Sequence, residues 1–122
     1  SRDARERLEA ATDAQGRPLE VVLLPSPGPL HISAEEAQGV DVAEGTVSRR
    51  AGDRMAASYV NFYLGNSRVV YPLLDPRHDE EVAAILRRTF PERDVVGVAA
   101  REILLGGGNL HCITQQVPSS AA

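Results

Sequence analysis

Three consecutive glycines near the end of the chain, Gly106, Gly107 and Gly108, are followed by Asn109 and by the single cysteine, Cys112. A cysteine thiolate is a strong nucleophile, whereas one cysteine can neither form a disulfide within the chain nor supply the ligands of a structural zinc site alone. Glycines let a small polar ligand approach backbone amides and carbonyls closely. The pattern therefore allows nucleophilic chemistry beside a main-chain pocket, although the residue types alone do not favour it. A flexible turn and a small buried thiol remain the alternatives.

His111 directly precedes Cys112 and is the nearest candidate base. Adjacent side chains on an extended chain point to opposite sides, so we expect His111 to be a structural or solvent-facing residue. The other histidines, His31 and His78, lie in unrelated sequence contexts, and we expect both at the surface. The glycine spacing matches neither a phosphate-binding P-loop nor a dinucleotide-binding fingerprint.

The elements that must position this motif begin with an alternation of apolar and polar residues from Tyr59 to Leu64, which predicts a strand. Gly65 and Asn66 follow. Because both tolerate positive φ, they predict a tight hairpin turn, with 68–71 as the returning strand.

A helix is predicted next, with Asp75 as its N-cap and Pro76 at its first position. Its apolar residues recur at helical spacing, and Pro91 ends it before a further strand at 94–98. The order is therefore ββαβ, a small α/β unit. We expect one core to be formed by Val60, Phe62, Val82, Ile85, Leu86 and Phe90.

The first half of the chain predicts a helix at 2–11 and a short strand from Leu19 to Leu24, buried on both faces. We therefore expect residues 1–24 to end a preceding module and residues 25–52 to form a long loop or insertion. Residues 53–118 then form the last ββαβ module with the cysteine motif, and 119–122 a tail.

Composition narrows the function classes. The chain has 122 residues, 43% of them hydrophobic, and a formal charge of −4 with no lysine. These values predict a soluble globular protein and argue against a nucleic-acid partner, which would select clustered basic residues. No apolar run approaches the ~20 residues of a membrane span, and the first residues lack a secretory signal, so a cytoplasmic location is expected.

Three segments, 57–63, 90–98 and above all 101–116 with its Gly-Gly-Gly-Asn-Leu-His-Cys run, resemble the end of agmatine deiminases. The similarity is close from about Arg54 to Pro118 and looser over 1–24. Residues 25–52 are longer than the family pattern.

The resemblance implies a pentein fold, a propeller of five ββαβ modules of which this chain holds about one and a half. It also implies hydrolysis of agmatine to N-carbamoylputrescine and ammonia, a step of putrescine biosynthesis, without metal or organic cofactor. Cys112 takes the position of the nucleophile that attacks the guanidinium carbon and forms a thiouronium intermediate. Gly106, Gly107, Gly108 and Asn109 are implied to bind the substrate.

The histidine and carboxylates that the family also needs match no motif here. We therefore expect the partners of this chain to be a small guanidine substrate and missing amino-terminal modules, with a homo-oligomer also open. The isolated chain should be inactive, and nothing in it is expected to lower the pKa of Cys112. Three alternatives remain: deimination of peptidyl-arginine or another guanidine, a non-catalytic interaction module, and an unrelated thiol enzyme that pairs Cys112 with His111.

Overall fold

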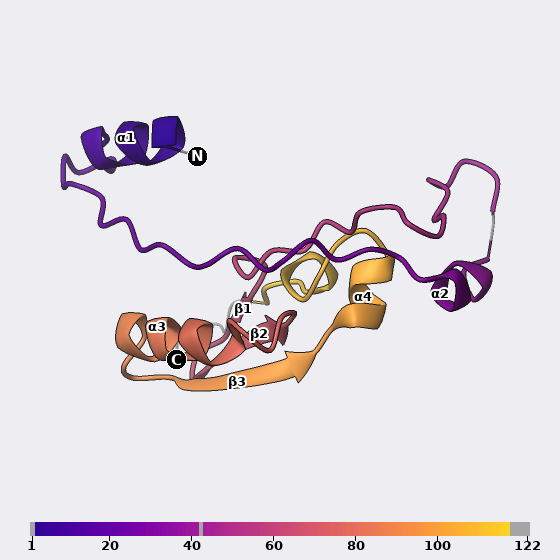
Figure 1. The fold of residues 1–122 in the computed structure, drawn as a ribbon. Helices are drawn as coiled ribbons and strands as arrows, with labels where there is room; N and C mark the ends of the chain where they lie inside the picture. Colours follow the sequence, from indigo (N-terminus) through magenta and orange to yellow (C-terminus); the bar gives the residue numbers. More distant parts are fainter. Residues whose placement is uncertain (1, 42, 118–122) are drawn as a thin grey trace.

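The structure is a computed structural model that describes residues 2–41 and 43–117. Its centre is a three-stranded sheet of β1 (Tyr63–Leu64), β2 (Arg68–Leu73) and β3 (Asp94–Ala99), in the order β1-β2-β3. β1 and β2 pair antiparallel, and β2 and β3 pair parallel over six residues each. Helix α3 (Asp79–Thr89) makes the connection between the parallel strands and lies along the sheet (Figure 1). The predicted ββαβ order is confirmed.

The first strand is shorter than predicted. Only its last two residues pair in the sheet, and the backbone from Tyr59 to Phe62 leaves it. Tyr59 is consequently buried, while Val60 is 68% exposed. The prediction that Val60 belongs to the core was therefore wrong. The hairpin itself is confirmed and closes with Gly65 N donating to Arg68 O at 2.8 Å. However, neither Gly65 nor Asn66 has positive φ, and the register of the two strands centres the turn on Asn66 and Ser67, one residue later than predicted.

The start predicted for α3 was also wrong. Asp75 and Pro76 form a turn before the helix, in which the carboxylate of Asp75 accepts the backbone N–H of Arg77 at 3.1 Å. The helix proper begins at Asp79, whose carboxylate accepts a hydrogen bond from the Tyr59 hydroxyl at 2.5 Å. Burial and this carboxylate raise the pKa of Tyr59, so its hydroxyl stays protonated and remains a donor.

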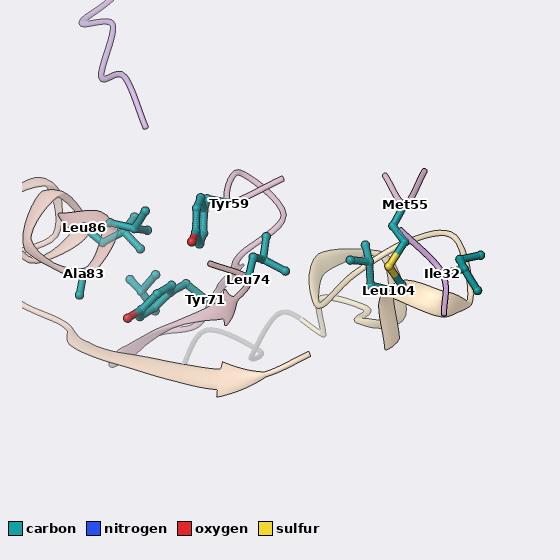
Figure 2. Close-up of a cluster of buried hydrophobic side chains, with 10 residues drawn as sticks. Ile32, Met55, Tyr59, Tyr71, Leu74, Ala83, Leu86 and Leu104 are labelled. Atoms are coloured by element: carbon teal, nitrogen blue, oxygen red, sulfur yellow. The ribbon is translucent and has the colours of Figure 1, made fainter. Parts of the chain in front are cut away.

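The core lies between α3 and the sheet and extends toward helix α4 (Arg101–Leu105). Figure 2 shows its two ends, one around Tyr71 and Leu86 and the other where Ile32, Met55 and Leu104 meet. Of the predicted core, Val82 and Leu86 are fully buried, whereas Phe62, Ile85 and Phe90 are half-buried. Phe62 and Phe90 pack edge to face at 6.0 Å between ring centroids.

Within residues 2–24, Leu24 packs against this core, whereas the first helix does not. Helix α1 (Arg2–Ala10) confirms the predicted helix but buries no residue, and it stands apart from the sheet (Figure 1). The strand predicted from Leu19 to Leu24 was wrong. This segment is extended but unpaired, and Leu23 is 56% exposed. An apolar run becomes a strand only when a neighbouring strand supplies hydrogen bonds, and the described part of the chain supplies none here.

The 25–52 segment contains a short helix, α2 (Ala34–Gln38), that the sequence analysis did not predict. Ser33 and Glu36 form a capping box at its start. Glu36 also binds the Arg101 guanidinium at 2.5 and 3.0 Å, which joins α2 to α4. None of the helices over residues 2–41 and 43–117 is both long and apolar enough to cross a membrane.

Candidate active site

Cys112 lies at the middle of a short 3-10 helix, η1 (His111–Ile113), just after the glycine-rich turn that follows α4. Its thiol is exposed, so the alternative of a small buried cysteine was wrong. Gly106 caps α4 and Gly107 has φ of 92°, a left-handed conformation that favours glycine. This reversal turns the chain back at the end of α4 and presents Cys112 at the surface.

Gly108 lies directly against the nucleophile candidate. A Cβ atom added at Gly108 would approach Cys112 Cβ to 2.8 Å and Cys112 Sγ to 3.1 Å. Real Cβ atoms do not come so close to other carbons, so any side chain here would displace the cysteine. Of the three glycines, Gly108 is therefore the one whose missing side chain bears directly on the thiol.

The side chain that binds Cys112 is Asn61, which the sequence analysis did not single out. Its amide nitrogen Nδ2 donates to Cys112 Sγ at 3.0 Å. Its amide oxygen Oδ1 accepts the backbone N–H of His111 at 2.8 Å and that of Cys112 at 3.4 Å. The available signal was an amide side chain inside the apolar 57–63 segment that resembles agmatine deiminases.

The hydrogen bond from Asn61 lowers the pKa of the Cys112 thiol, and backbone hydrogen bonding at Asn109 lowers it further, against an opposing effect of burial. A donor to sulfur favours the thiolate over the thiol. The expectation that nothing in this chain lowers that pKa was therefore wrong. The thiolate is the nucleophilic form of cysteine, so this hydrogen bond agrees with the role predicted for Cys112, which stays a prediction.

His111 is exposed, and no hydrogen bond joins its ring to Cys112 within the described chain. The backbone here is a 3-10 turn and not the extended chain that we assumed, and successive side chains in such a turn point about 120° apart. Of the other histidines, His31 is exposed, and His78 is half-buried with Nδ1 3.4 Å from Glu81 Oε2.

The carbonyls at the end of α4 are bound by Arg49, another residue that the sequence analysis missed. Its Nε donates to Leu105 O at 2.8 Å and its Nη2 to Gly106 O at 3.2 Å. Gly107 lies against the same guanidinium, since a Cβ there would come within 2.5 Å of Arg49 Nη2. The carbonyl oxygen of Gly106 therefore accepts its hydrogen bond from Arg49 in this structure.

The side chain of Asn109 is fully buried. Its Oδ1 accepts the backbone N–H of Leu110 at 2.8 Å, and its Nδ2 has no partner in the part of the chain that the structure describes. A substrate-binding role for Asn109 and for the three glycines thus stays a prediction.

A cavity beside the glycine-rich turn does not include the thiol. A cavity of about 420 Å³ between the 47–56 segment and the end of α4 is lined by Arg49, Arg54 and Gly107, but not by Cys112. Across residues 2–41 and 43–117, no group of three or more His, Cys, Asp or Glu side chains is arranged to hold a metal ion.

The sequence of this chain is similar to those of known proteins. The sequence model of the Porphyromonas-type peptidyl-arginine deiminases matches residues 1–118. A Shewanella frigidimarina protein that bears the name agmatine deiminase is 59% identical over 120 residues, and one from Photobacterium profundum is 54% identical over 118. Each alignment covers at least 97% of this chain but 32% of the relative, so the chain spans about a third of their length.

The fold is similar as well. The solved agmatine deiminase of Enterococcus faecalis superimposes with a TM-score of 0.84 at 38% identity, over 96% of this chain and 32% of the other. This chain, with its ββαβ sheet, α4 and cysteine turn, is therefore similar in fold to about one third of that protein.

Proposed function

The chain belongs to the Porphyromonas-type peptidyl-arginine deiminase family, and on that premise we propose that it is the carboxyl-terminal part of an enzyme that hydrolyses agmatine to N-carbamoylputrescine and ammonia. The observation that carries the proposal is the exposed Cys112 thiol, held by Asn61 and bordered by the bare backbone of Gly108. The agmatine assignment draws on the names of the relatives that match nearly the whole chain.

In the proposed reaction, the Cys112 thiolate attacks the guanidinium carbon and forms a C–S bond. One C–N bond then breaks, and its nitrogen takes a proton and leaves as ammonia, which gives a thiouronium. Water adds to the same carbon and loses both of its protons, one of which replaces the proton given to the leaving nitrogen, and the C–S bond breaks with its electron pair returning to sulfur. The products are a ureido group and regenerated thiolate, with no change of oxidation state.

A guanidinium is a poor electrophile, so this chemistry needs further groups. Carboxylates must hold and localise the substrate charge, and an acid–base residue must protonate the leaving nitrogen as an acid and then activate water as a base. We propose that these groups lie in the remaining two thirds of the enzyme, in additional ββαβ modules of a pentein propeller. This accounts for the exposed Cys112 and for the apolar segment from Leu19 to Leu24, which here finds no strand partner.

The second candidate substrate is peptidyl-arginine, favoured by the description of the matching family. Both substrates present the same guanidinium to sulfur and differ at the far end, which agmatine leaves as a primary amine. The two are distinguished by ammonia release from agmatine and from an arginine-containing peptide under identical conditions.

The decisive experiment compares ammonia release from agmatine by the full-length protein, by its Cys112→Ser variant and by residues 1–122 alone. We expect turnover only from the first. The His111→Ala variant of the full-length protein is the matched control and should stay active. Undiminished turnover by Cys112→Ser would refute the assignment of the nucleophile, and loss of turnover in His111→Ala together with retained thiol alkylation would favour the local Cys–His pair.

A further inference from the structure

We propose that Asn61 is a catalytic residue of this site, which holds the sulfur of Cys112 with its amide nitrogen while its amide oxygen fixes the backbone that carries the cysteine. The inference rests on the proposed function for its role in turnover, although the geometry is independent of the substrate. Asn61 lies just before β1 and Cys112 in η1, 51 residues later, so the contact joins the ββαβ sheet to the glycine-rich turn.

The hydrogen-bonding pattern fixes which end of the amide faces the sulfur. The backbone N–H groups of His111 and Cys112 both point at the same atom of Asn61. Two donors require an acceptor, so that atom is the amide oxygen. The other terminal atom, which faces Cys112 Sγ at 3.0 Å, must then be the nitrogen. Because the amide oxygen accepts these two backbone N–H groups, Asn61 must present its amide N–H to the Cys112 sulfur.

A neutral donor at this place suits both ends of the reaction cycle. Before attack, this donor stabilises the thiolate but leaves its negative charge in place. A fully charged partner would stabilise the thiolate more strongly and would also offset its charge. When the C–S bond breaks, the electron pair returns to sulfur, and the same N–H stabilises the departing thiolate. In the thiouronium between these steps the sulfur is a poor acceptor, so the bond strengthens only where negative charge collects on sulfur.

Two other groups near the turn carry or can acquire charge. His111 is the neighbour of Cys112 in η1, and Arg49 binds the carbonyls of Leu105 and Gly106. Neither donates to Cys112 Sγ in the described structure, so Asn61 is the side chain in contact with sulfur. A pH profile of the thiol therefore needs His111→Ala as a comparison.

The test uses Asn61→Asp in the full-length protein, because aspartate keeps the oxygen that accepts the His111 N–H but replaces the donor to sulfur with a second, negatively charged oxygen. We expect the pH midpoint for alkylation of Cys112 by iodoacetamide, located by peptide mass spectrometry, to move to higher pH. We also expect kcat for agmatine to fall by on the order of 10-fold or more, with a smaller change in KM. The matched control is Asn66→Asp, the same change at an exposed turn position.

Asn61→Ser serves as a second variant should Asn61→Asp fail to fold, since a serine hydroxyl can donate but is too short to span the 3.0 Å contact. An unchanged or lower alkylation midpoint in a folded Asn61 variant would overturn the proposal. A raised midpoint supports it even if the wild type releases no ammonia from agmatine, in which case the substrate assignment fails and the role of Asn61 stands.

Discussion

Replacing Leu86 by Ala tests the packing of α3 on the sheet. Leu86 is 2% exposed in the core cluster, next to an open apolar groove of about 150 Å³ whose lining includes Val60 and Phe90. The change deletes about three carbon groups at ~0.8 kcal/mol each, or roughly 2.4 kcal/mol of lost burial. A closed cavity would add to this loss. Here the deleted volume joins a groove that water can enter, so we expect a total near 2 to 3 kcal/mol.

The assay is urea unfolding of the 122-residue chain, followed by far-UV circular dichroism and analysed with a common m-value. Leu8→Ala is the matched control, because it makes the same chemical change in α1 at a position that is 47% exposed. We expect the control to change the free energy of unfolding by less than about 0.5 kcal/mol. A loss below about 1 kcal/mol for Leu86→Ala, or equal losses for both variants, would refute the burial argument.

Three further outcomes follow from the site and its supports. In the full-length protein, Gly108→Ala should reduce agmatine turnover by on the order of 100-fold, because its Cβ would displace Cys112, which lies 2.8 Å away; turnover within twofold of wild type would contradict this. The Arg101 guanidinium, followed by the Ser33 backbone N–H, lowers the pKa of Glu36 to about 2 from an ordinary 4.5, so its contribution to stability is complete above pH 4.5 and is lost as pH falls toward 2. Glu36→Gln should therefore flatten the fall in melting temperature over this window, and parallel curves for both proteins would exclude the effect. Arg49→Lys should lower the melting temperature, since one ammonium replaces a guanidinium that binds the carbonyls of Val47, Leu105 and Gly106, and an unchanged melting temperature would show that this cap is dispensable.

Elements with local signals were predictable from the sequence. Helix α3 was found from its apolar spacing, which matches the period of a helix with one buried face, and the strand predicted at 94–98 corresponds to β3. The start of α3 was misplaced because the Asp75 carboxylate caps a turn before the helix, which sequence alone does not separate from a helix cap. The strand predicted from Leu19 failed for a different reason, because hydrogen-bonded pairing depends on a neighbouring segment and not on the run itself.

The candidate site was half predictable. Cys112 was proposed from its residue type and motif, whereas Asn61 lies 51 residues away and meets it only through the tertiary fold. Helix α4 was hidden because its five residues precede three glycines, which dominate the local pattern. Val60 was wrongly predicted to lie in the core because the alternation of apolar and polar residues implies a core-facing side chain only if the strand continues back to Tyr59, and it does not.

The attachment of η1 has a consequence for hydrogen exchange. This 3-10 turn buries no residue, and its backbone is bound to the rest of the chain through Asn61, whereas the preceding Leu110 is buried. A segment with so few apolar contacts opens at a lower free energy than the sheet, so the amides of His111 and Cys112 should exchange well before those of β2. We expect the boundary between slow and fast exchange to fall between Leu110 and His111. Cys112, the proposed nucleophile, therefore belongs to a small segment that we expect to open and close while the ββαβ framework stays folded, and a covalent ligand on Cys112 should slow the exchange of these amides.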